Sequence, residues 1–168
     1  MLGVHFAITE QQERKLLKAA KKGDDAVGDL VGDLEEEWDD DAMKVDSDKA
    51  WDAIHRCLGD GTLDPGGGEY PLTHAVLGGR DLHEDYYVIY VTAGEVRDVA
   101  AAVRGLDRAW LRERFDAIDD PDYRGAGDAD DFEYTWENFA DIQAFYARAA
   151  DAGRAGGGWA AGGETPPP

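Results

Sequence analysis

Hydrophobic and polar residues alternate at the start of the chain. Leu2, Val4, Phe6 and Ile8 alternate with smaller or polar residues, and this period of two predicts a strand ending at Ile8. The same alternation leads us to expect that His5 faces solvent or a small polar contact.

The spacing then becomes helical. Thr9 and Gln12 stand three residues apart as in a capping box, and they predict a helix that ends near Lys21 to Gly23. A second helix is predicted from apolar residues on one helical face, namely Val27, Leu30, Val31, Leu34 and Trp38. Its other face is almost wholly acidic, and Gly28 and Gly32 each weaken it by up to about 1 kcal/mol relative to alanine. We therefore expect this helix to depend on tertiary packing.

The middle of the chain combines one helix, a glycine-rich loop and a strongly apolar strand. After a short strand over residues 42–45, Ser47 or Asp48 is expected to cap a helix with one face formed by Trp51, Ile54, His55 and Leu58. Residues 59–68 predict a loop, and residues 71–79 form an apolar segment without a clear assignment. Residues 86–91, which read YYVIYV, predict a central strand covered on both faces.

The last third of the chain is predicted to be helical. Thr92 and Glu95 form a second capping box, and Asp107 is expected to cap a short helix. An acidic loop over residues 119–131 precedes a long helix over residues 135–152. The sequence thus predicts one α+β domain over residues 1–154 and a disordered Gly/Pro-rich tail over residues 155–168.

Net charge changes this picture more than any other feature of composition. The 168 residues contain 17 Lys and Arg against 37 Asp and Glu, so the formal net charge is −20. Three explanations remain open: a solvated acidic surface that favours solubility, recognition of a basic protein partner, and mimicry of DNA. A field of this sign disfavours binding to nucleic acid and to anionic membranes.

The chain lacks the features of a secreted or membrane protein. Its N-terminal residues have neither the basic start nor the apolar run of a signal peptide, and no segment approaches roughly 20 apolar residues. Cys57 is the single cysteine, so no intramolecular disulfide is possible, and we expect this thiol to be structural. A cytoplasmic location follows as the expectation, while the oligomeric state stays open.

No complete catalytic motif is present, and no cofactor is predicted. The glycine-rich loop lacks the lysine of a phosphate-binding loop, and no nucleophile-elbow pattern occurs. A metal site from His55, His74, His83 and Asp85 is chemically conceivable, but the spacings match no known ligand motif, so none is predicted. For His55, a hydrogen-bonded histidine of the core or of a cleft is the favoured interpretation.

Two segments resemble a known family. Residues 45–58 contain Asp48-Lys49-Ala50-Trp51 followed by His55, and residues 71–79 read PLTHAVLGG. Together they are similar to the YfbM-like proteins, a bacterial family of unknown function. The resemblance implies an α+β fold with a mixed β-sheet and packed helices, and it implies no known reaction. Members of that family usually end in an apolar strand, but three consecutive glycines, Gly156 to Gly158, predict that this strand is weak or absent here.

Two functions compete at this point. The first is a non-enzymatic, immunity-like module that binds a basic protein through its acidic face. The second is a small-ligand binder or enzyme with a cleft formed by Lys49, Trp51, His55 and His74. The alternative for these residues is structural, with Trp51 filling the core and His55 bonded to a backbone carbonyl. The missing catalytic motifs and the extreme charge favour the first function.

Overall fold

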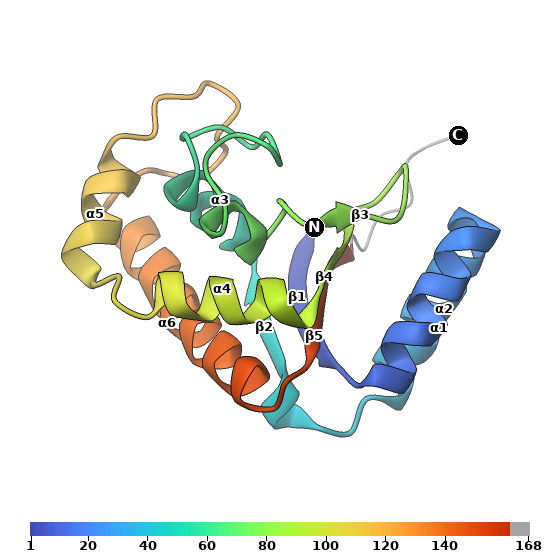
Figure 1. The fold of residues 1–168 in the computed structure, drawn as a ribbon. Helices are drawn as coiled ribbons and strands as arrows, with labels where there is room; N and C mark the ends of the chain where they lie inside the picture. The colour runs from blue at the N-terminus through green and yellow to red at the C-terminus, as the bar shows by residue number, and fades with distance from the viewer. Residues whose placement is uncertain (162–168) are drawn as a thin grey trace.

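The computed structural model describes residues 1–161 and has three layers (Figure 1). A five-stranded sheet separates the helix pair α1–α2 from the helices α3 to α6. The helices are α1 (Glu10–Lys22), α2 (Asp24–Glu37), α3 (Trp51–Leu58), α4 (Ala93–Val103), α5 (Arg108–Asp116) and α6 (Ala129–Asp151), with 3-10 turns η1 (Asp41–Met43) and η2 (Leu72–Ala75). The strands are β1 (Leu2–Ile8), β2 (Lys44–Asp48), β3 (Arg80–Asp81), β4 (Val88–Val91) and β5 (Ala155–Ala161). No helix within residues 1–161 is long and apolar enough to cross a membrane.

The strand order in the sheet is β2-β1-β5-β4-β3. Every neighbouring pair among these strands is antiparallel. The predicted α+β class is therefore confirmed, but the prediction of a mixed sheet is wrong. The last strand of the sequence lies at the centre, between β1 and β4. The two ends of the described chain therefore pair directly, with Leu2 opposite Ala161.

Most helix starts follow the local signals in the sequence. Both capping boxes form, at Thr9 with Gln12 and at Thr92 with Glu95. The start of α3 differs, because Ser47 and Asp48 belong to β2 and no side chain caps the helix. The Ser47 hydroxyl instead donates to the Gly3 carbonyl at 3.0 Å, so its partner is the neighbouring strand rather than a helix end.

Strand β5 forms within the predicted tail, and His5 is buried instead of facing solvent, so both predictions are wrong. The glycines of β5 explain both results. His5 pairs with Gly158 across β1 and β5, and its ring lies so close that a Cβ at Gly158 would stand 3.2 Å from Nδ1. A Cβ at Gly156 would stand 2.7 Å from a methyl group of Val91. The glycines thus admit neighbouring side chains, and the strand forms because partners flank it on both sides. The remainder of the predicted tail, residues 162–168, lies outside the described residues.

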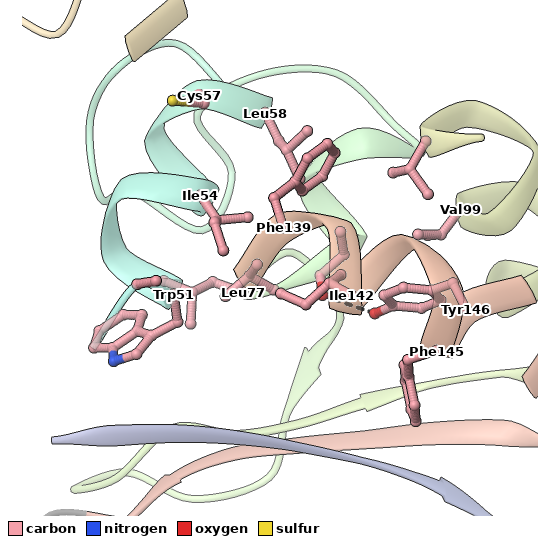
Figure 2. Close-up of a cluster of buried hydrophobic side chains, with 14 of the residues drawn as sticks. Trp51, Ile54, Cys57, Leu58, Leu77, Val99, Phe139, Ile142, Phe145 and Tyr146 are labelled. Atoms are coloured by element: carbon pink, nitrogen blue, oxygen red, sulfur yellow. Dashed lines mark hydrogen bonds between the residues drawn. The ribbon is translucent and has the colours of Figure 1, made fainter. Parts of the chain in front are cut away.

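Each face of the sheet carries its own hydrophobic core. On the α3–α6 face, Phe139, Ile142 and Phe145 of α6 pack with α3 and α4 above the strands (Figure 2). On the opposite face, buried residues of β1, α1 and α2 pack around Trp159, including Phe6, Ile8, Leu16, Val27 and Leu34. Strand β4 contributes alternate residues to the two cores, which confirms that it is covered on both faces.

Candidate ligand-binding site

A cleft of about 420 Å³, here called the α3–α6 cleft, opens on the α3–α6 side of the sheet. It is lined by residues 49–53, residues 123–125, Met1 and three residues of α6, namely Asp131, Tyr134 and Thr135. A cleft of this volume falls within the range of roughly 300–1,000 Å³ that is typical of small-molecule sites.

An unusual turn places Lys49 at the cleft. Asp48, which links β2 to α3, has a φ of 47°, a left-handed conformation that non-glycine residues rarely adopt. Tyr134 of α6 stabilises the turn, because its hydroxyl donates to the Asp48 carboxylate at 2.6 Å and accepts from the Lys49 amide at 3.0 Å. Burial, followed by the bond to Asp48, raises the pKa of Tyr134. Backbone strain held by surrounding contacts is a common feature of functional sites.

The charged side chains around the cleft fall into two groups. The acids are engaged: Asp52 pairs with Arg56 at 2.6 Å, and Asp131 accepts from the Tyr123 hydroxyl at 2.7 Å. The cations Lys49 and Arg124 are exposed, and neither lies within 4.0 Å of a carboxylate among residues 1–161. The start of α3 adds the positive end of a helix dipole to the same wall. The cleft therefore combines two cations that have no carboxylate partner among residues 1–161 with two carboxylates that already have protein partners.

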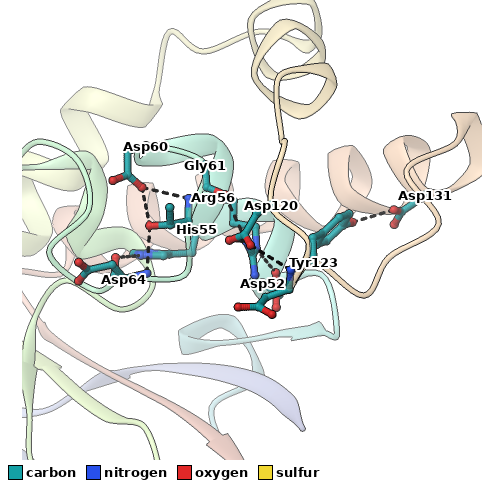
Figure 3. Close-up of polar contacts among 11 residues, drawn as sticks. Asp52, His55, Arg56, Asp60, Gly61, Asp64, Asp120, Tyr123 and Asp131 are labelled. Carbon is teal, nitrogen blue, oxygen red and sulfur yellow. Dashed lines mark hydrogen bonds and ion pairs between the residues drawn. The ribbon is translucent and has the colours of Figure 1, made fainter.

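Arg56 connects α3 with the loop before α6, two segments that line the cleft (Figure 3). Its side chain is 1% exposed and binds Asp52 of α3 and Asp120 of the loop before α6, at 2.6 and 2.5 Å. Burial alone would lower the pKa of Arg56, but the hydrogen bonds that its guanidinium donates to these carboxylates outweigh burial and raise that pKa. Its guanidinium also lies 5.5 Å from the centre of the Tyr123 ring. Arg56 thus holds Tyr123, and with it the loop, against α3.

Of the four residues proposed for a Trp/His cleft, the structure brings Lys49 and Trp51 together and separates both histidines from them. The Trp51 ring is 7% exposed and its indole N–H donates to the Met1 carbonyl at 3.1 Å. His55 points into the 59–68 loop, where Nε2 contacts the Asp64 carbonyl at 2.9 Å (Figure 3). Burial lowers the pKa of His55. His55 is therefore a buried histidine bonded to a backbone carbonyl, which is the structural role considered for it from the sequence.

His74 lies apart from this cleft, beside α4. Its Nε2 is 3.2 Å from the Glu95 carboxylate, its Nδ1 is 3.1 Å from the Thr73 hydroxyl, and the Tyr70 ring packs against it edge-on. His83 lies at a third place, where its Nδ1 is 3.9 Å from Oδ2 of Asp24. The conceivable metal ligands thus do not converge, and within residues 1–161 no three His, Cys, Asp or Glu side chains form a group that can hold a metal ion. Cys57 is buried, and burial raises the pKa of its thiol to about 12.

Sequence reasoning missed Arg56, Tyr123, Arg124 and Tyr134. One signal was available, because Arg124 is the sole lysine or arginine between Arg114 and Arg148, in a segment crowded with acids. For Arg56 the sequence offers the pair with Asp52 four residues earlier, but its second partner, Asp120, is 64 residues away and has no local signal.

Residues 1–156 match the family model described as a domain of unknown function, DUF1877. The chain belongs to this family. A solved structure with the same fold is that of YfbM from Escherichia coli, a protein of unknown function, at 20% identity and a TM-score of 0.70. The match covers 95% of this chain and 99% of YfbM, so the resemblance noted from residues 45–58 and 71–79 is confirmed. A comparison with curated proteins finds no match.

Proposed function

We propose that this DUF1877 protein binds a small organic molecule in the α3–α6 cleft without transforming it. The observation that carries the proposal is the combination of a cleft of about 420 Å³ with two cations that have no carboxylate partner among residues 1–161. Cations left without a partner at a concave site are available to a ligand, whereas those on a flat surface are solvated.

Binding is favoured over catalysis because the acid–base groups at the cleft are already engaged. Asp52 is held by Arg56, while Asp131 accepts from both Tyr123 and the Gly127 amide. A general base must reach the substrate proton, and a carboxylate that is already paired or hydrogen-bonded within the protein is less available for that role. The supported activity is thus reversible recognition of a ligand.

A thermal-shift screen with a metabolite library tests this proposal. Hits on the natural protein are compared with Lys49→Gln/Arg124→Gln and with the matched control Lys15→Gln/Lys18→Gln, which removes two exposed cations of α1. We expect ligands that raise the Tm of the natural protein and of the control but not of K49Q/R124Q. If no compound stabilises the protein, or if every hit also stabilises K49Q/R124Q equally, the cleft is not the binding site.

A second candidate function is binding of a basic protein through α2. Its motivating observation is that Asp25, Asp29, Asp33 and Glu36 are all exposed at helical spacing, while α2 contains no lysine or arginine. Like charges one helical turn apart repel, and a cationic partner would relieve that repulsion.

Capture of partners from lysate at low and high salt tests the second candidate. Binding should weaken steeply as salt rises, because charges separated by more than the Debye length of about 8 Å at physiological ionic strength are screened. The variant Asp29→Asn/Asp33→Asn/Glu36→Gln should lose the captured protein. The control Glu137→Gln/Asp141→Asn/Asp151→Asn, which neutralises three exposed acids of α6, should retain it. Equal retention by both variants contradicts a role for α2.

A further inference from the structure

We infer that the ligand of the α3–α6 cleft is a small oxyanion, a carboxylate or phosphate, attached to a flat apolar body. This inference rests on the proposed function and specifies the chemistry of the ligand. It follows from the polar groups that the cleft leaves available and from those that it has already paired.

The available charges at the cleft are positive. Lys49 and Arg124 line the cleft from two different segments, the turn before α3 and the loop before α6, and neither is engaged by a carboxylate among residues 1–161. The nearby acids Asp48, Asp52 and Asp131 each accept hydrogen bonds from protein donors. An ammonium and a guanidinium at one cleft match a carboxylate or phosphate, and arginine can bind such groups through two parallel hydrogen bonds.

The aromatic residues at the cleft offer ring surface rather than polar atoms. The Trp51 indole N–H is taken by the Met1 carbonyl, the Tyr123 hydroxyl by Asp131, and the Tyr134 hydroxyl by Asp48. Trp51 is buried, whereas Tyr123 and Tyr134 are half-buried, so these two tyrosines can contribute to a ligand mainly through their apolar rings. A flat apolar body beside the oxyanion therefore fits the rest of the lining.

The net charge of −20 gives this inference a distinctive salt dependence. The long-range field of the protein repels an anion before it reaches the local cations, and moderate salt screens that repulsion. Affinity for an anionic ligand should consequently fall less steeply with salt than a two-cation site on a neutral protein would predict. A basic protein bound to α2 would show the opposite, a steep loss.

Five probes in an amide-resolved NMR titration separate the chemical classes. Benzoate and phenyl phosphate carry both features, benzamide is the neutral counterpart, benzylamine is cationic, and inorganic phosphate lacks the flat body. We expect probes of this size to bind with a Kd on the order of 1 mM, which such a titration resolves. The same titrations are run on K49Q/R124Q and on the control K15Q/K18Q.

We expect benzoate and phenyl phosphate to bind roughly tenfold more tightly than benzamide, with shifts at residues 49–53 and 123–135. K49Q/R124Q should abolish that preference, whereas K15Q/K18Q should preserve it. The relative Kd values of benzoate and phenyl phosphate then distinguish a carboxylate from a phosphate ligand.

Other outcomes overturn the inference in separable ways. Benzamide or benzylamine binding in the cleft as tightly as benzoate would reject the oxyanion but leave the proposed binding function standing. Inorganic phosphate binding as tightly as phenyl phosphate would reject the flat body. Absence of shifts at the cleft with all five probes would overturn the inference, and a negative library screen in addition would overturn the proposed function.

Discussion

The two faces of the sheet differ in how their covering helices are held. On the α3–α6 face a large apolar core is supplemented by polar contacts between distant segments. Tyr146 donates to the Ala75 carbonyl at 2.7 Å, Gln143 donates to the Val103 carbonyl at 2.7 Å, and Arg56 binds Asp120. On the α1–α2 face the core is smaller, and the polar contacts to the helices end on carboxylates: the Trp159 indole N–H donates to Glu35 at 2.6 Å and the Tyr90 hydroxyl donates to Glu13 at 3.1 Å. The outer surface of α2 is acidic.

This difference separates a rigid site from a charged surface. A binding site needs its walls fixed, and the α3–α6 face provides buried side chains that bond to loop backbone. The α1–α2 face needs only to cover the sheet, and its unbalanced charge favours solubility at the cost of repulsion within α2.

Removing one core side chain from each face should expose the difference in packing. Phe139 is fully buried on the α3–α6 face, and Leu34 is 7% exposed at the end of α2. We expect Phe139→Ala to lower the free energy of unfolding by about 4 kcal/mol and Leu34→Ala by about 2 kcal/mol. Urea denaturation followed by circular dichroism measures both. A larger loss for Leu34→Ala would mean that the two cores do not differ as described.

Arg56 should matter far more than a surface arginine. Arg56→Met leaves two carboxylates without their buried partner, and we expect a loss of about 3 kcal/mol in the free energy of unfolding. Arg112, whose pair with Asp116 is exposed, provides the control, and Arg112→Met should cost less than about 1 kcal/mol. Hydrogen exchange should also quicken in residues 117–127 of the Arg56 variant alone. Equal effects of the two substitutions would refute the anchoring role.

His5 should make stability depend on pH. Burial lowers the pKa of His5 from 6.5 to about 4, and its Nε2 has no hydrogen-bond partner among the described residues. The unfolded chain therefore binds a proton below pH 6.5 that the folded protein takes up only near pH 4. The contribution of His5 to the free energy of unfolding is therefore fully present above pH 6.5. It decreases as the pH falls, by about 2 kcal/mol at pH 5.

Denaturation curves measured between pH 4 and 8 test this prediction. Replacing His5 with Phe should flatten the dependence between pH 4 and 6.5, whatever its effect on absolute stability. Some dependence of the same sign should remain, because burial also lowers the pKa of His55. An unchanged pH profile in His5→Phe would show that His5 is not the responsible group.

The smallest effect concerns charge on α2. Neutralising Asp29 and Asp33, which are exposed one turn apart, should raise the free energy of unfolding by about 0.5 kcal/mol. The same change at Asp141 and Asp151 of α6, which are ten residues apart, should have little effect. Thermal unfolding at low salt makes the comparison sensitive. If the α2 variant is not the more stable of the two, repulsion within α2 is negligible.

Much of the fold was predictable because its signals are local. The capping boxes at Thr9 and Thr92 join residues three positions apart, and α2 follows from a repeating apolar face. The long final helix was also predicted, although it begins six residues earlier, at Ala129, where Asp128 caps it. The candidate site was only half predictable. Lys49 and Trp51 stand in a recognisable motif, whereas Tyr123 and Tyr134 reach the cleft through long-range packing.

Local signals and composition were enough to predict the helices, the apolar strand β4, the α+β class and the excess of negative charge. These properties depend on composition or on interactions within a few residues. Tertiary structure alone decided that a glycine run forms the central strand, because glycine has little strand preference of its own and needed the His5 ring and two flanking strands. It also decided where the cleft lies. Lys49 and Arg124 line the same cleft, and the loop that carries Arg124 is bound to α3 by the contact between Arg56 and Asp120 across 64 residues, which no local pattern encodes.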